Sequence, residues 1–246
     1  MAGKMQFCFK RYEKKYMLTS NQLTQMMAGI KDYMRADEFG RYTICNIYYD
    51  TDDFRLIRAS LEKPVYKEKL RMRSYGVPGS RGEVFVELKK KFDSIVYKRR
   101  TVMEAADAVS YLHSGAVPKR EDQICHEIDW FMNTYRPKPK VFIAYDRTAF
   151  AGIEDPELRL TFDTNLRWRT RDLDLRAGDD GELLLPSDQI LMEIKIPGTT
   201  PVWLAHLLSE AGAFPTSFSK YGACYQQNIL GRRRSGGAGR EVRACA

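Results

Sequence analysis

Polar and apolar residues alternate along the segment KEKLRMRSYG, which spans residues 67–76. Because successive side chains of an extended strand point to opposite faces, this alternation predicts a strand with one apolar and one charged face. Leu70 and Met72 fall on the apolar parity. The charged parity carries four cations, Lys67, Lys69, Arg71 and Arg73. Four like charges in a row repel one another, so something must balance them.

Similar patterns along the chain predict eight strands and five helices. The strands are expected at 5–17, 42–51, 65–76, 82–92, 94–103, 140–149, 157–169 and 188–197. Apolar residues at helical spacing predict long helices at 19–34, 120–137 and 199–212, and shorter ones at 52–62 and 104–114. The turn sequences GVPGSRG and FDS join neighbouring strands, which favours antiparallel hairpins. We expect one folded domain over residues 1–230 and a disordered basic tail over 231–246.

Cations dominate the charged parities of these strands. They are Arg11, Lys15, Lys69, Arg71, Arg73, Lys89, Lys98, Arg100, Arg147, Arg167, Arg169 and Lys195, against the acids Glu13, Glu87, Asp163 and Glu193. An ordinary sheet with one solvated face usually mixes signs, because like charges on opposite strands destabilise pairing. About eight strands can close around a single ligand. We therefore predict an α+β fold, a closed antiparallel eight-stranded β-barrel with helices packed on its outside and the cations in its lumen.

A lumen lined by cations is unfavourable when empty, because the charges lose hydration and repel one another. A bound polyanion would make the same lumen favourable, since it neutralises the cations and arginine forks match phosphate oxygens bidentately. Cations spaced along strands suit a linear anion such as a triphosphate or a polyphosphate. The few carboxylates could complete, with phosphate oxygens, the ligand shell of Mg²⁺ or Mn²⁺.

The net charge of +8 is unevenly distributed. Residues 231–246 hold five arginines and one glutamate, a net charge of +4, so residues 1–230 carry only the other +4. The folded part is therefore not broadly basic, and it lacks a helix-turn-helix signature and a basic strip interleaved with aromatic residues. We expect no specific nucleic-acid partner.

Several other classes of protein are disfavoured. The sequence has no dinucleotide-binding G-x-G-x-x-G and no P-loop. Its five cysteines are scattered without a C-x-x-C pair, and its three histidines share no ligand spacing, which argues against a disulfide framework or a zinc site. No apolar run reaches the ~20 residues that a spanning helix needs, so we expect no transmembrane segment and a cytoplasmic location.

Six motifs occur in an order that resembles the VTC domain, a member of the CYTH or triphosphate tunnel metalloenzyme superfamily. They are RYEKKY, LRMRSYG, VELKKK, YDRTAF, LMEIK and SFSKY. The resemblance covers residues ~7 to ~228. It implies a triphosphate tunnel and a polyphosphate polymerase that transfers the γ-phosphoryl of ATP onto a growing inorganic polyphosphate chain with a divalent metal.

The resemblance implies roles for particular residues. Those that look like the family's phosphate ligands are Lys15, Arg71, Arg73, Lys89, Lys98, Arg100 and Arg147. Glu193 looks like the metal-binding glutamate, with Lys195 beside it, and Lys220 in SFSKY resembles a family lysine near the tunnel. Glu13 and Lys15 resemble the second half of an E-x-E-x-K signature. Two positions depart from the pattern, because Arg11 replaces the first glutamate and Ser217 stands where a further lysine is expected.

These assignments give a definite hypothesis about the site. The expected catalytic residues are Arg71, Arg73, Lys89, Arg147 and Glu193, and the expected metal ligands are Glu193, Glu13 and Glu87. The phosphate-binding set is expected to comprise Arg11, Lys15, Lys69, Arg71, Arg73, Lys89, Lys98, Arg100, Arg147, Arg167, Arg169, Lys195 and Lys220. Three alternatives remain open: a triphosphatase acting on inorganic triphosphate or nucleoside triphosphates, a non-catalytic module that binds polyphosphate or inositol phosphates, and a nucleic-acid binder.

Overall fold

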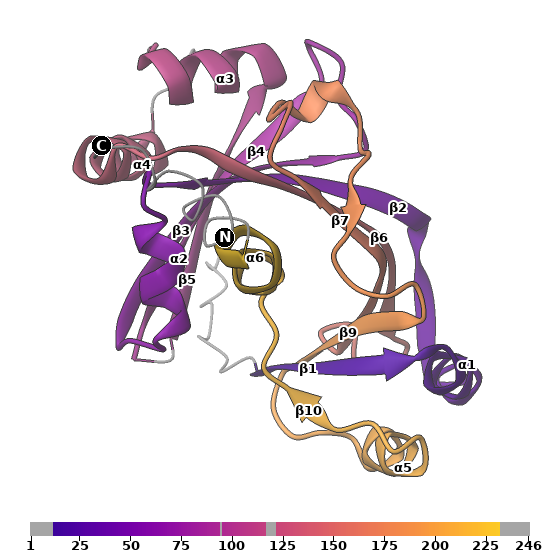
Figure 1. Cartoon of the computed structure of the whole chain (residues 1–246). Coiled ribbons are helices and arrows are strands. Elements are labelled where there is room, and N and C mark those ends of the chain that lie inside the picture. Colours follow the sequence, from indigo (N-terminus) through magenta and orange to yellow (C-terminus); the bar gives the residue numbers. More distant parts are fainter. Residues whose placement is uncertain (1–11, 94, 117–121, 232–246) are drawn as a thin grey trace, which may run out of the picture. The chain divides into compact units, whose positions relative to one another are not determined.

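The computed structural model describes residues 12–93, 95–116 and 122–231, and its strands form one ten-stranded sheet (Figure 1). The strands are β1 Tyr12–Thr19, β2 Met34–Asp50, β3 Tyr66–Tyr75, β4 Glu83–Phe92, β5 Ile95–Glu104, β6 Lys138–Gly152, β7 Arg159–Arg169, β8 Glu182–Leu183, β9 Gln189–Ile196 and β10 Pro215–Thr216. Their order in the sheet is β10-β1-β9-β7-β6-β2-β3-β4-β5, with β8 paired to β7.

Six α-helices accompany the sheet. They are α1 Ser20–Gly29, α2 Arg55–Leu61, α3 Ala105–Ser114, α4 Gln123–Tyr135, α5 Val202–Glu210 and α6 Lys220–Cys224. A short 3₁₀ turn follows β7 at Leu175–Ala177, and a π-helical turn at Tyr225–Ile229 extends α6. All five helices expected from apolar spacing are present. The helix α6 lies outside every predicted helical segment, because five residues are too few to show a period.

The eight expected strands are confirmed within the described residues, which leave out residues 5–11 of the first one, but the closed eight-stranded β-barrel is wrong. The sheet has an open path that ends at β10 on one side and β5 on the other, and no pairing joins these two strands in the part of the chain that the structure describes. The physical reason lies in the end strands. Most side chains of β5 are exposed on both of its faces, and β10 is only two residues long. A suitable number of strands therefore did not imply closure.

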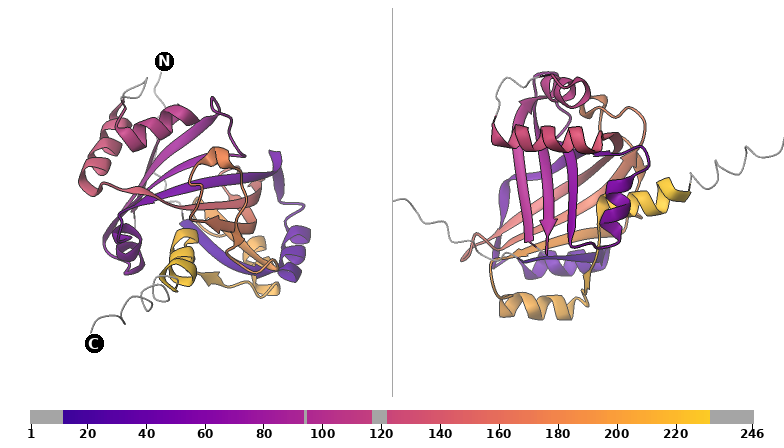
Figure 2. Two further views of the ribbon diagram at one scale, coloured as in Figure 1. Left: turned by 45° about the horizontal axis from the view of Figure 1, so that its top comes forward. Right: turned by 90° about the vertical axis from the view of Figure 1, so that its left-hand side faces the viewer.

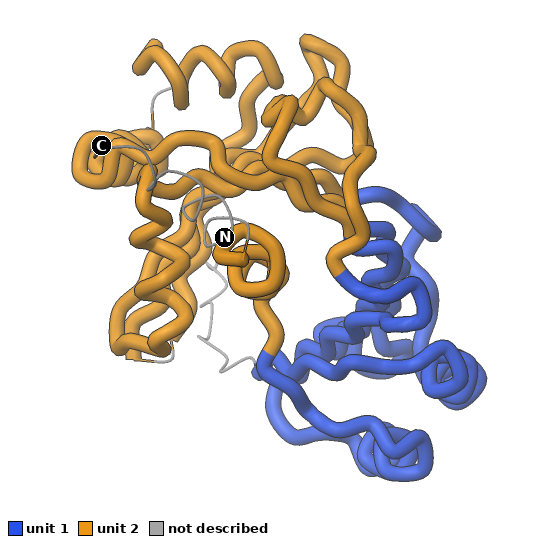
Figure 3. The backbone as a smooth tube through the Cα atoms, in the orientation of Figure 1, with its two compact units in different colours: residues 1–43, 145–166, 185–217 blue, residues 44–144, 167–184, 218–246 orange. Residues whose placement is uncertain are grey.

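The chain divides into two compact units, each with its own hydrophobic core (Figure 3). Unit 1 comprises residues 1–43, 145–166 and 185–217, and unit 2 comprises 44–144, 167–184 and 218–246. The core of unit 1 gathers apolar side chains of β1, β9 and β7 with those of α1 and α5. The tail expected at 231–246 lies, beyond its first residue, outside the described residues.

In unit 2 the apolar parity of the strands meets the helices. Leu70, Met72, Val86 and Leu88 are fully buried in a cluster with apolar residues of α3 and α4, such as Phe131. Both helices therefore cover one face of β3, β4 and β5, as the side view shows for α4 (Figure 2). The alternation read from the sequence is confirmed here, and the opposite parity is left for the charged side chains.

A buried carboxylate fixes α2 and α6 to unit 2. Asp50, at the end of β2, is fully buried and accepts hydrogen bonds from the backbone N–H groups of Leu56 at 2.9 Å and Ile57 at 3.0 Å. Phe54 precedes α2 with a positive φ and provides no side-chain cap, so Asp50 caps the helix in its place. The Tyr221 hydroxyl of α6 donates to the same carboxylate at 2.9 Å.

We expect Asp50→Ala to lower the free energy of unfolding by about 2–3 kcal/mol, because three buried donors lose their acceptor. Urea denaturation would measure the change. Asp53→Ala removes a nearby exposed carboxylate and serves as the matched control, with a change of less than about 1 kcal/mol. Equal effects of the two substitutions would contradict the assigned role of Asp50.

Candidate functional site

The charged parity of β3, β4 and β5 forms a set of cross-strand rows in unit 2, which we call the cation face. The first row pairs Lys67 with Lys91, and the second brings together Lys69, Lys89 and Lys98. The third row is Arg71–Glu87–Arg100, and the fourth is Arg73–Phe85–Val102. The cation face is thus defined by Lys67, Lys69, Arg71, Arg73, Lys89, Lys91, Lys98 and Arg100. Opposed side chains in such rows start ~5 Å apart at their Cβ atoms, so like charges directly oppose one another.

One carboxylate lies among these cations. Glu87 is only 2% exposed, and its Oε2 accepts from Arg71 Nε at 2.7 Å and lies 2.6 Å from Arg71 Nη2. Its Oε1 pairs with Lys98 Nζ at 2.6 Å, and Arg73 Nε lies 3.8 Å from Oε2. Burial raises the pKa of this carboxyl, but Arg71, Arg73 and Lys98 together outweigh burial and lower the pKa to about 2. Glu87 is therefore ionised and holds three cations in place.

Two polar side chains of β2 orient the arginines further. Arg73 Nε donates to Asn46 Oδ1 at 2.9 Å, and Arg71 Nη1 donates to the Tyr48 hydroxyl at 3.3 Å. The sequence reading missed Asn46 and Tyr48. A usable signal existed, because both fall on one parity of the segment CNIYYD and Asn46 is polar in an otherwise buried strand.

Helix α6 also contacts the cation face. The Ser219 hydroxyl, which caps α6, accepts from Lys69 Nζ at 3.3 Å. The ring of Tyr221 stacks on Tyr48 with centroids 4.8 Å apart. Lys220, expected to bind phosphate, is the first residue of this helix.

Unit 1 holds a second charge cluster, in which opposite signs are paired. Arg147 forms a bidentate ion pair with the buried Asp163, with Nε–Oδ1 at 2.6 Å and Nη2–Oδ2 at 2.8 Å. Arg147 Nη2 also reaches Glu193 Oε2 at 3.5 Å. Lys15 Nζ lies 3.6 Å from Glu193 Oε1 and 3.7 Å from Glu13 Oε1. The strand register places Lys195 opposite Glu13 and Lys15 opposite Glu193.

The carboxylates differ in how well they suit a divalent metal. Glu13 and Glu193 both lie within 4 Å of one ammonium group, Lys15 Nζ. One or two carboxylates completed by phosphate oxygens and water are a usual donor set for Mg²⁺, and Mn²⁺ accepts the same ligands. No group of three or more potential ligands occurs among the described residues. Glu87 does not fit, because three cations already surround it.

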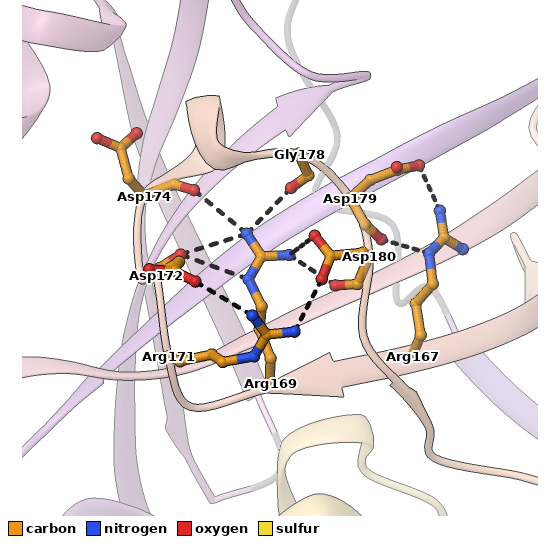
Figure 4. Close-up of polar contacts among 8 residues, drawn as sticks. All are labelled: Arg167, Arg169, Arg171, Asp172, Asp174, Gly178, Asp179 and Asp180. Carbon is orange, nitrogen blue, oxygen red and sulfur yellow. Dashed lines mark hydrogen bonds and ion pairs between the residues drawn. The ribbon is translucent and has the colours of Figure 1, made fainter.

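Arg167 and Arg169 lie at the end of β7, and their side chains hydrogen-bond to the loop that follows it in unit 2 (Figure 4). Arg169 is 4% exposed, and its guanidinium donates to the backbone carbonyls of Asp172, Asp174, Gly178 and Asp180 at 2.6–3.4 Å.

The neighbouring arginine has a similar arrangement. Arg167 donates to the carbonyl of Asp179 at 2.5 Å and to its carboxylate at 2.6 Å. Of the expected phosphate ligands, these two arginines have the guanidinium groups most fully used by the protein's own loop. Arg11 lies outside the described residues, and the phosphate-binding role of the whole set stays a prediction.

Comparison with known proteins identifies the family of this chain. The profile of the VTC domain matches residues 10–229. The chain belongs to the VTC domain family. This confirms the resemblance read from the sequence motifs.

This VTC domain is similar to vacuolar transporter chaperone complex subunit 4 of Schizosaccharomyces pombe, with 28% identity over 210 residues. The alignment covers 73% of this chain but 29% of that protein, so the chain spans less than a third of the length of its relative.

Two solved structures share the fold at low sequence identity. A Bacillus halodurans protein, described as a candidate adenylate cyclase, superposes with a TM-score of 0.53 and 16% identity, covering 88% of this chain and 96% of that one. The Hippeastrum protein HpAC1, a candidate adenylyl cyclase with a dominant triphosphatase activity, superposes with a TM-score of 0.53 and 14% identity. The match covers 87% of this chain and 94% of that one.

No described helix of the VTC domain is long and apolar enough to cross a membrane.

The stability of the VTC domain is expected to depend on Glu87 at acid pH. Its pKa is about 2 in the folded protein, below the ordinary value of 4.5. The ionised form is therefore favoured by folding, and this stabilisation is present above pH 4.5 and lost as the pH falls towards 2. Between pH 4.5 and pH 2 we expect the free energy of unfolding of the wild type to fall by about 3 kcal/mol more than that of Glu87→Gln. Urea denaturation at a series of pH values would measure it, with the exposed Glu83→Gln as a control that follows the wild type.

Arg169→Lys is expected to lower the free energy of unfolding by about 2–3 kcal/mol, because one ammonium group cannot serve four carbonyls that a guanidinium serves. Chemical denaturation would measure this change. Arg171→Lys, in the same loop with an exposed side chain, is the matched control and should change stability by less than about 0.5 kcal/mol. A stable Arg169→Lys protein with weakened phosphate binding would instead support the sequence-based role.

Proposed function

We propose that this VTC domain is a polyphosphate polymerase, which transfers the γ-phosphoryl group of ATP onto the end of an inorganic polyphosphate chain. The observation that carries the proposal is the composition of the cation face, whose four rows hold eight cations from three adjacent strands and one carboxylate, Glu87. Such a surface has a large excess of positive charge that a linear polyanion would neutralise. Membership of the VTC domain family supports the same conclusion.

The reaction needs alignment and charge neutralisation more than covalent catalysis. The bond between the γ-phosphorus and the β–γ bridging oxygen breaks, a bond to a terminal oxygen of the acceptor chain forms, and ADP leaves. The acceptor oxygen is already anionic, so no general base is required. Arg71 and Arg73 are proposed to bind phosphate oxygens bidentately, since Glu87, Asn46 and Tyr48 fix their guanidinium groups beforehand.

Lys89 and Lys98 are proposed to neutralise the oxygens of neighbouring phosphates, because they stand in the same row of the cation face. In unit 1, Glu193 with Glu13 would hold Mn²⁺ or Mg²⁺. The metal, when bound, supplies positive charge to phosphate oxygens. Arg147 is proposed to bind phosphate and to keep Glu193 in position.

A triphosphatase is the alternative enzyme. If water replaces the acceptor chain, the same groups would hydrolyse a triphosphate. The solved structure of HpAC1, whose fold is shared, belongs to a protein with a dominant triphosphatase activity.

Incubation of the purified chain with ATP and Mn²⁺ separates these functions. A polymerase produces ADP together with long-chain polyphosphate, whereas a triphosphatase produces free phosphate without polymer. We expect polymer, and a drop in its rate of about 100-fold for Arg71→Ala, because the lost fork binds phosphate in the transition state. Glu193→Ala should lower the rate with Mn²⁺ to the rate that the wild type shows without the metal.

Arg99→Ala is the matched control, because Arg99 lies on β5 beside Arg100 but on the opposite face, where it pairs with Glu127. It should retain activity within about twofold of the wild type. Full activity in Arg71→Ala and Glu193→Ala would refute the site, and free phosphate without polymer would favour the triphosphatase. If ATP were bound without any turnover, the domain would be a binding module.

A further inference from the structure

The two ends of the cation face differ in chemistry. At one end, Arg73 stands in a row with Phe85 and Val102, and Tyr75 follows on the same parity of β3. Tyr75 is 52% exposed, Val102 is 48% exposed, and the rings of Tyr75 and Phe85 pack edge to face with centroids 5.6 Å apart. Glu83 and Glu104 oppose each other on the same parity in the next row, so this end presents aromatic and aliphatic surface between the cations on one side and two exposed carboxylates on the other.

An arginine connects this surface to the charged rows. The guanidinium carbon of Arg100 lies over the ring of Phe85, 5.0 Å from its centroid. Aromatic rings and guanidinium planes are the groups on which nucleic-acid bases stack, and such stacking depends little on which base is present. A molecule with a flat base joined to phosphates would match this order of groups.

The opposite end of the face is made of lysines. Lys67 opposes Lys91, and the next row holds Lys69, Lys89 and Lys98. The ammonium group of Lys67 also donates to the carbonyl of Ser60 at 3.1 Å. Burial, and then the charges of Lys91 and Lys63, hold the pKa of Lys67 below its usual value, so these ammonium groups are close enough to repel one another.

Arginine and lysine are thus separated along the strands. The arginines of the face occupy the two rows nearest the aromatic end, and the lysines occupy the two rows beyond them. An arginine fork fixes the orientation of the phosphate that it binds, whereas a lysine ammonium acts as a rotatable point charge. Fixed binding suits a reacting triphosphate, and point charges suit a uniform chain that must move after each addition. Arg73 and Lys67 are six residues apart on β3, a distance of ~20 Å along the strand.

We propose that the cation face has a direction, with the nucleoside of ATP stacked at the Tyr75–Phe85 end and the polyphosphate chain bound along the Lys67–Lys91 end. This inference rests on the proposed function and adds to it which end receives which substrate.

Binding measurements on the full chain test the aromatic end, with ATP and inorganic tripolyphosphate as separate probes. Tyr75→Ala should weaken ATP binding about five- to tenfold, the loss of one partly exposed stacking contact, and leave tripolyphosphate binding within about twofold. Tyr75→Phe keeps the ring and should behave as the wild type. Tyr97→Ala is the matched control, because Tyr97 is 49% exposed on β5 but lies on the parity opposite to Lys98. It should leave both affinities unchanged.

The lysine end is tested with long-chain polyphosphate and ATP. The double variant Lys67→Ala/Lys91→Ala should weaken long-chain binding at least tenfold more than ATP binding, because only the long chain extends to these residues. Lys90→Ala, one residue away on the opposite face and paired with Glu127, is the control for removal of a lysine. Thermal unfolding would check that each variant is folded.

The outcomes separate this inference from the proposed function. If the wild type binds neither ATP nor polyphosphate, the proposed function itself fails. If it binds both, but Tyr75→Ala affects ATP and tripolyphosphate equally or not at all, the proposed direction is wrong while the function stands. A selective loss of ATP binding in the double lysine variant would show that the direction is reversed.

Discussion

The repulsion between opposed cations on β3, β4 and β5 is the constraint on which the rest of unit 2 depends. Three lysines form one row, and the neighbouring row contains Glu87, the one carboxylate of the four rows of the cation face. That carboxylate neutralises part of the charge of Arg71, Arg73 and Lys98 and leaves a net positive surface. A fold that existed only for stability would alternate the signs. The surviving excess of charge is therefore best understood as a binding property.

The apolar parity of the same strands makes this excess tolerable. Like charges on opposed strands cost up to ~1 kcal/mol per pair, whereas a buried leucine, methionine or valine stabilises by about 1.5–3 kcal/mol. Leu70, Met72, Val84, Val86 and Leu88 are all buried beneath α3 and α4. Burial on one face thus exceeds repulsion on the other. The strict alternation of the sequence is the means by which one strand carries both properties.

The same alternation explains what could be predicted from the sequence. It located eight strands and the parity of the cation face, because side-chain direction in a strand depends only on position. It did not reveal that the sheet stays open, since strand pairing involves residues far apart in the chain. It also could not distinguish the partners of Arg71, which pairs with Glu87, from those of Arg169, which donates to carbonyls of the loop after β7. Both arginines lie on charged parities, and only the course of the loop after β7 distinguishes them.

The two charge clusters show how register determines chemistry. In unit 1 the register of β1 and β9 opposes Lys15 with Glu193 and Glu13 with Lys195, so opposite charges satisfy one another across the strands. In unit 2 the register opposes lysine with lysine. A shift of one residue on any of these strands would send its charged side chains to the apolar face. The apolar cores therefore fix the register, and the register in turn decides that unit 2 has a surplus of cations and that unit 1 has carboxylates balanced by cations. A surplus of cations suits an anionic chain, whereas Glu13 and Glu193 of unit 1 are the carboxylates that we propose as ligands of a hard metal ion, with phosphate oxygens as its other ligands.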